Sequence, residues 1–164
     1  MPEAKHNARL MSYASIGDFH QIFQEENDSL YRLSFLLTAD REKAQECLVS
    51  GLQAVKGSRV FKEWARSWTR RAIIQNAIRV INPRPMKEVA PWNFDGDGTT
   101  PAVGLAETAA VLQLEPFERF VYVMSVLEHY SDQDCSLLLG SARREVMAAR
   151  IRALQQLEMR PILI

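Results

Sequence analysis

The chain has 164 residues, a length that suits one ordinary domain or two small ones. Its composition, 47% hydrophobic and 24% charged, is close to that of an average soluble protein and argues against a disordered chain. The formal net charge is zero, so the chain as a whole has no field that would draw it onto nucleic acid.

Charge is nevertheless distributed unevenly along the chain. Residues 1–55 hold five basic and eight acidic side chains, whereas residues 56–87 hold nine basic ones. Between Val89 and Glu118 there is no Lys or Arg, and apart from Arg119 the arginines return from Arg143 onward. The net value therefore conceals two basic segments separated by an acidic one.

The two cysteines, Cys47 and Cys135, each lie in an apolar helical context. This argues against a disulfide framework and for a reducing compartment. The first twenty residues are polar and mixed, unlike a signal peptide, and no run of about 18 apolar residues could span a membrane. We therefore expect a soluble, cytoplasmic protein with no membrane partner.

Helical periodicity marks the first half of the chain. Apolar residues recur at spacings of three and four over 19–37, and Asp18 is the expected N-cap of this helix. Thr38 or Asp40 can cap a second helix, whose apolar positions continue over 44–55. The sequence "KGS" then breaks the pattern.

A third helix is predicted from Val60 to Ile81, where Pro83 and Pro85 stop it. Trp64 and Trp68 belong to its apolar stripe. A Trp at helical spacing is more often a core residue than a binding residue, so we expect both to be core. The rival interpretation is a basic helix whose Trp rings stack on single-stranded nucleic acid.

The segment "NPRPMKEVAPWNFDGDGTTPAVG" is rich in Pro and Gly and has no sustained period, which indicates a linker. Its centre, "DGDGT", resembles a fragment of a calcium loop. The later ligand positions, including the bidentate Glu, are missing. We expect no metal and no cofactor.

Helices return after the linker. The expected helices are 108–112, 114–129, 131–139 and 143–157. Pro116 suits a first turn, Ser131 an N-cap, and Gly140 the left-handed position between two helices. No β-like alternation competes, so the sequence predicts an all-α fold.

The domain organisation expected from these patterns has two small helical lobes. Residues 1–84 form the first helical domain and 85–108 the linker. Residues 109–164 form a second domain that contains a helix-turn-helix.

Two segments, in this order, resemble one known family. "LTADREKAQECL" with "FKEWARSWTRRAIIQNAIR" resembles the second conserved region of extracytoplasmic-function sigma factors. "LEPFERFVYVMSVLEHYSDQDCSLLLGSARREVMAARIRALQQL" resembles their fourth region, and this match is the stronger one. The positions that match the family pattern in this second segment are Leu114, Pro116, Glu118, Arg119, Val121, Leu139, Gly140, Val146, Arg152, Ala153, Leu154 and Leu157.

The resemblance implies a detachable subunit of RNA polymerase. Its first lobe would bind the polymerase core and open the minus-ten promoter element. Its second lobe would place the last helix in the major groove of the minus-thirty-five element. The resemblance also implies control by an anti-sigma protein.

The chain departs from the family pattern at several positions. Val49 and Ser50 stand where the family has a Gln-Glu pair that faces the polymerase. Glu145, Met147 and Ala149 replace Thr, Lys and Arg in the recognition helix, and each lost phosphate contact weakens DNA binding. The segment between the second and third helices, which would read the minus-ten element, is also short.

The candidate site residues follow from this resemblance and from the basic segments. The expected DNA-binding residues are Arg143, Arg144, Arg150, Arg152, Arg66, Arg70, Arg71 and Arg79. The expected polymerase-binding residues are Gln45, Glu46 and Leu48. The simpler interpretations are solvated helix faces for the arginines and a favourable acidic first turn for the second set.

The sequence does not predict an enzyme. His6, His20 and His129 are scattered, and neither cysteine has a metal-ligand spacing. We find no phosphate-binding loop and no nucleophile motif. Besides a sigma factor, two alternatives stay open: a sigma-like interaction module that has lost promoter recognition, and an unrelated helical regulator that binds DNA as a dimer.

Overall fold

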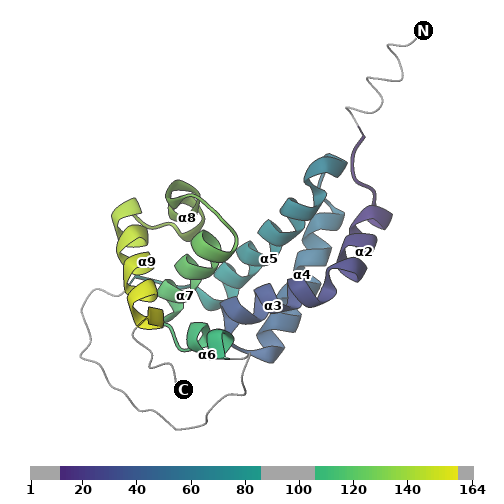
Figure 1. The fold of residues 1–164 in the computed structure, drawn as a ribbon. Helices are drawn as coiled ribbons and strands as arrows, with labels where there is room; N and C mark the ends of the chain where they lie inside the picture. Colours follow the sequence, from purple (N-terminus) through teal and green to yellow (C-terminus); the bar gives the residue numbers. More distant parts are fainter. Residues whose placement is uncertain (1–11, 86–105, 159–164) are drawn as a thin grey trace. The chain divides into compact units, whose positions relative to one another are not determined.

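The computed structural model describes residues 12–85 and 106–158. Within these two ranges every regular element is a helix (Figure 1), which confirms the predicted all-α class. The one β-type pairing in the described residues is an isolated antiparallel bridge between Tyr13 and Phe61. The predicted linker at 85–108 and its "DGDGT" segment fall almost entirely outside the described residues.

The chain divides by its internal contacts into two compact units, Met1–Val80 and Ile81–Ile164. We call them unit 1 and unit 2. Unit 1 contains α2 (Ile16–Glu25), α3 (Asn27–Thr38), α4 (Arg41–Lys56), the short 3-10 turn η1 (Lys62–Trp64) and α5 (Ala65–Ile81). Unit 2 contains α6 (Ala106–Leu112), α7 (Pro116–Tyr122), the π-turn η2 (Val123–Leu127), α8 (Asp132–Leu139) and α9 (Arg143–Glu158).

The first predicted helix is two helices, and its predicted N-cap is wrong. Ser15 caps α2, and the Asp18 carboxylate accepts a hydrogen bond from the Ser15 N–H at 2.7 Å. In return, the Ser15 hydroxyl accepts from the Asp18 N–H at 3.1 Å, which completes a capping box. The backbone then leaves the helical region at Glu26, with φ −109° and ψ 16°, and α3 begins at the next residue.

The predicted ends of the second and third helices are confirmed. Asp40 caps α4 by accepting from the Lys43 N–H at 3.0 Å, and the helix ends before Gly57, where "KGS" predicted a break. The third helix ends at Ile81, as the following prolines predicted, although its regular α-helical part starts only at Ala65. Helix α5 approaches α4 closely at Gly51, where an added Cβ would lie 3.0 Å from Cγ1 of Ile73.

Unit 2 differs from the sequence prediction in its longest element. The single helix expected over 114–129 is α7 followed by the π-turn η2, and it ends before His129, which has a left-handed φ of 61°. The predicted N-cap at Ser131 and the predicted left-handed turn at Gly140 are confirmed. The Ser131 hydroxyl accepts from the Asp134 N–H, and Gly140 has φ +64°.

The core of unit 2 determines which face of α9 meets solvent. Val146, Ala149 and Ala153 are fully buried, and they lie on one side of the helix. Buried side chains from the preceding helices complete this core: Phe117, Phe120, Val121, Val123, Met124 and Cys135. The opposite side of α9 is therefore the side that could meet another molecule.

Candidate nucleic-acid interface

The four predicted DNA-binding arginines of α9 fall into two pairs. Arg143 and Arg144, in the first turn, are exposed, and within the described residues neither forms a hydrogen bond or ion pair. Arg150 instead forms an ion pair with Asp132 through both terminal nitrogens, one of them 3.3 Å from Oδ2. Only the first pair presents uncommitted charge to solvent.

Arg152 is held by a buried carboxylate. Its Nε donates to Oε1 of Glu118 at 2.7 Å, and the Glu118 side chain is only 6% exposed. The other oxygen of Glu118 is buried without a hydrogen-bond partner among the described residues. Arg152 is therefore the counter-ion of a buried acid, which is a structural role.

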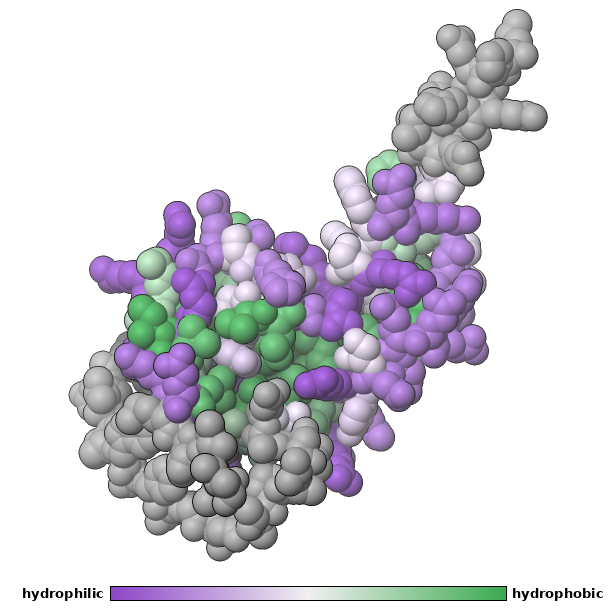
Figure 2. Space-filling model, in the orientation of Figure 1, coloured by the Kyte–Doolittle hydropathy of each residue, from purple (hydrophilic) through white to green (hydrophobic). Residues whose placement is uncertain are grey.

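The middle of the solvent face of α9 carries three apolar side chains. Met147, Ile151 and Leu154 are 44%, 53% and 37% exposed. Figure 2 shows apolar surface over this helix and its neighbours in unit 2. Ala149, where the family has an arginine, is fully buried, so that position cannot face DNA in this chain.

The predicted arginines of α5 are also partly committed. Arg66 lies 2.7 Å from Glu25 and 3.4 Å from Glu26, and its hydrogen bond is the main cause that lowers the pKa of Glu25. Arg70 donates to the Ser29 hydroxyl at 3.0 Å, so both side chains tie α5 to α2 and α3. The remaining two reach solvent: Arg71 is half-buried, and Arg79 is exposed and donates to Asn76 at 2.6 Å.

The expectation that Trp64 and Trp68 are core residues is wrong, because their side chains are 60% and 42% exposed. The rings of Trp64 and Phe61 pack edge to face with their centroids 5.8 Å apart, and the Phe61 ring stacks on that of Tyr13 with centroids 4.9 Å apart. The Arg59 guanidinium lies over the Tyr13 ring, also at 4.9 Å. We call Tyr13, Arg59, Phe61, Trp64 and Trp68 the aromatic surface.

Tyr13 and Arg59 are not among the site residues predicted from the sequence. Tyr13 stands in a polar N-terminal stretch and meets Phe61 only through the isolated bridge, which joins residues 48 positions apart. The signal that could have found the aromatic surface was the concentration of Phe and Trp among the basic residues of 56–71.

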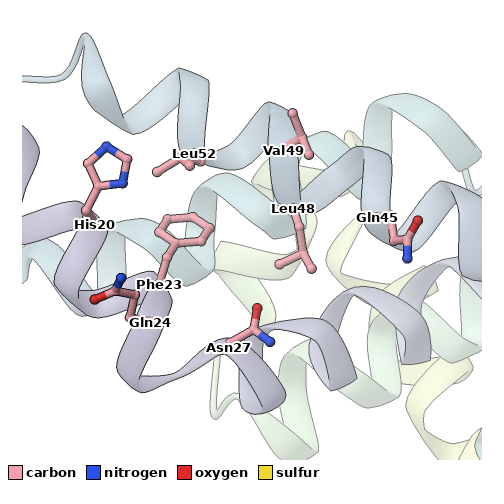
Figure 3. Close-up of a pocket in the computed structure, with 8 residues that line it drawn as sticks. All are labelled: His20, Phe23, Gln24, Asn27, Gln45, Leu48, Val49 and Leu52. Atoms are coloured by element: carbon pink, nitrogen blue, oxygen red, sulfur yellow. The ribbon is translucent and has the colours of Figure 1, made fainter.

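A groove in unit 1 brings together two of the three predicted polymerase-binding residues. It has a volume of about 650 Å³ and is open to solvent. In Figure 3, side chains of α2 and the start of α3 face one side of α4 across it. Its lining residues are His20, Phe23, Gln24, Asn27, Gln45, Leu48, Val49 and Leu52. Glu46 is exposed but is not part of the lining, so the structure separates it from Gln45 and Leu48.

The cysteines take no part in these surfaces. Both are buried free thiols, and burial raises the pKa of Cys135 to about 11 and also raises that of Cys47. Neither is therefore an available nucleophile near neutral pH. In the described part of the chain, no cluster of three His, Cys, Asp or Glu side chains could hold a metal ion.

The sequence matches no known family model and no curated protein. The described helices include none that is long and apolar enough to cross a membrane.

Proposed function

We propose that this chain acts in transcription initiation in the manner of a sigma factor, with RNA polymerase core and promoter DNA as its partners. The observation that carries the proposal is the aromatic surface of unit 1, in which two tryptophans are exposed and the Arg59 guanidinium lies over the Tyr13 ring. Such a protein would act in the cytoplasm.

The aromatic surface has the chemistry that single-stranded DNA requires. Bases stack on exposed aromatic rings regardless of sequence, and nearby arginines attract the phosphates. Trp64 and Trp68 are one helical turn apart on the same side of the chain, so both rings can face one strand. Arg71 and Arg79, which reach solvent, would supply the phosphate contacts.

The α8–α9 pair would act as the helix-turn-helix in this proposal. Arg143 and Arg144 lie at the N-terminal end of the second helix, which is the part of a recognition helix that reaches base edges. Arg150 and Arg152 would not contribute, because Asp132 and Glu118 hold them. We therefore expect weaker duplex binding than a set of four free arginines would give.

The groove lined by Gln45 and Leu48 would bind the polymerase core. Its apolar floor (Phe23, Leu48 and Leu52) and polar rim suit a helix of another protein. An anti-sigma protein could compete for the same surface.

Two variants separate these roles. Trp64→Ala with Trp68→Ala should reduce binding of a fluorescent single-stranded oligonucleotide about tenfold or more, and should leave capture by purified polymerase core unchanged. Val49→Asp places a charge in the groove at an exposed position, so it should abolish core capture and leave oligonucleotide binding unchanged. Run-off transcription should fail with both variants. If the wild-type chain binds neither core nor oligonucleotide, the proposal is wrong.

A second candidate is a sigma-like interaction module without promoter recognition. The observation that favours it is the apolar solvent face of α9, where a DNA-reading helix would carry polar donors. Such a module would bind a protein partner, and its weak DNA binding would hardly change with salt concentration. A salt titration of duplex binding therefore distinguishes it from the first candidate.

A further inference from the structure

The solvent face of α9 has a charge and apolar pattern that is complementary to itself. Ile151 lies at the middle of this face, and Met147 and Leu154 lie on either side of it, at spacings of four and three. These are the spacings of a helix that packs against another helix along an apolar seam. Within the described residues of unit 2 this seam is left uncovered, as the 53% exposure of Ile151 shows.

The charges at the two ends of the seam are opposite and equally distant from its centre. Arg144 is seven residues before Ile151, and Glu158 is seven residues after it. Seven residues make almost two helical turns, so all three side chains lie nearly in line, about 10 Å apart. Both end residues are exposed, and in the described structure neither has an ion-pair partner.

We infer that two copies of this chain associate through α9, antiparallel, with the two-fold axis close to Ile151. In this arrangement each Arg144 meets Glu158 of the other copy, and the two apolar seams cover each other. A parallel arrangement would instead place Arg144 against Arg144 and Glu158 against Glu158. The self-complementary surface is the kind that a two-fold dimer requires. The inference does not depend on the proposed function, and a dimer of this kind would compete with the proposed duplex contact, because both use Arg144.

The size of the seam limits the strength of the association. Three apolar side chains from each copy bury far less surface than a stable interface, which buries about 1,200 Å² in total or more. The dimer should therefore be reversible, with a dissociation constant in the micromolar to millimolar range. The full chain should be monomeric when dilute and dimeric when concentrated.

Sedimentation velocity of the full chain over a concentration series tests the inference. The mass should rise toward that of a dimer in the wild type, and Ile151→Asp should weaken association at least tenfold. Ile16→Asp is the matched control, because Ile16 is an equally exposed isoleucine (57%) in unit 1. It should associate as the wild type does. A wild type that stays monomeric throughout, or an equal loss in both variants, would overturn the inference.

Charge exchange tests the antiparallel register. Arg144→Glu and Glu158→Arg should each weaken self-association, since each brings two like-charged pairs together. An equimolar mixture of the two single variants should associate again, because both pairs are then opposite in charge. Restoration in the mixture supports the register, and a mixture as weak as its components would show that these residues do not meet.

Discussion

Arg150 of α9 is bound by Asp132, the first residue of α8, through both of its terminal nitrogens. This ion pair connects the start of one helix to the middle of the next and neutralises one of the arginines that the sequence assigned to DNA. The guanidinium keeps other N–H donors, but the carboxylate already balances its charge, so a phosphate gains little from it while the pair is intact. In the proposed duplex contact, α9 would therefore depend on Arg143 and Arg144.

The salt dependence of duplex binding should reveal this division. We expect Arg143→Ala with Arg144→Ala to reduce the slope of log affinity against log salt by about 2, since each phosphate contact contributes about 0.9. Arg150→Ala should leave the slope unchanged and reduce the free energy of unfolding by about 1 kcal/mol. Fluorescence anisotropy at several salt concentrations measures the slope.

Asp132→Asn provides the reverse experiment. It releases Arg150 without removing it, so the slope should increase by about 1. A slope that falls by about 1 in Arg150→Ala would show that the ion pair opens on DNA.

The Glu118–Arg152 pair should matter mainly for stability. Arg152→Ala leaves a buried carboxylate without its counter-ion, and we expect it to reduce the free energy of unfolding by about 2 kcal/mol, allowing for the partial exposure of the arginine. Adding Glu118→Gln should recover much of this loss, because the buried charge is then removed. Urea denaturation of the single and double variants measures both values. Equal stability of the two would contradict a charge effect.

Gly51 should be required for the close approach between α4 and α5. Gly51→Ala gains up to about 1 kcal/mol of helix propensity. The new Cβ, however, would lie 3.0 Å from Cγ1 of the fully buried Ile73, so the Ile73 side chain or the helices would have to shift. We expect a net loss of about 1 kcal/mol or more in thermal or urea denaturation.

Gly57→Ala is the matched control for this substitution. Gly57 has φ −90°, and an added Cβ would meet nothing within 4 Å. The control should therefore be neutral or slightly stabilising. A stabilised Gly51→Ala variant would show that the helices can separate at no cost.

Acid should destabilise unit 1 through the α2 capping box. The Ser15 backbone N–H, then the Ser15 hydroxyl, and to a lesser extent Lys62 lower the pKa of Asp18 below its ordinary value of 3.8. A carboxyl whose pKa is lower in the folded state stabilises the fold fully above its unfolded value, and this contribution disappears as the pH falls through the folded value. Stability should therefore decline below about pH 3.8, and Asp18→Asn should decline less. Urea midpoints between pH 6 and pH 2.5 measure the difference, and parallel curves would refute the contribution.

Local signals in the sequence located most helix boundaries. Asp40, Ser131 and Gly140 act where their side chains or backbone preferences predicted, because caps and left-handed turns involve residues at most a few positions apart. The same reasoning missed the break at Glu26 and the π-turn after Tyr122. Apolar periodicity continues across both irregularities, so the pattern alone could not show them.

The candidate site was less accessible from the sequence. Gln45 and Leu48 share a groove because they lie on one side of a single helix, which their spacing of three already indicated. The prediction that Trp64 and Trp68 lie in the core is wrong, because the apolar stripe in this sequence is wider than the helix face that is buried in unit 1. The exposure of a side chain depends on which other helices pack against it, and the apolar periodicity of one helix does not show this.

The sequence by itself determined the helical class, most of the caps and the location of the basic segments, since each depends on residues close along the chain. Only the tertiary structure decided which arginines are free. Asp132 is 18 residues from Arg150, Glu118 is 34 from Arg152, and Glu25 is 41 from Arg66. Charge attraction acts through space, so the folded positions of these acids, and not the arginine count, set the charge that DNA could meet.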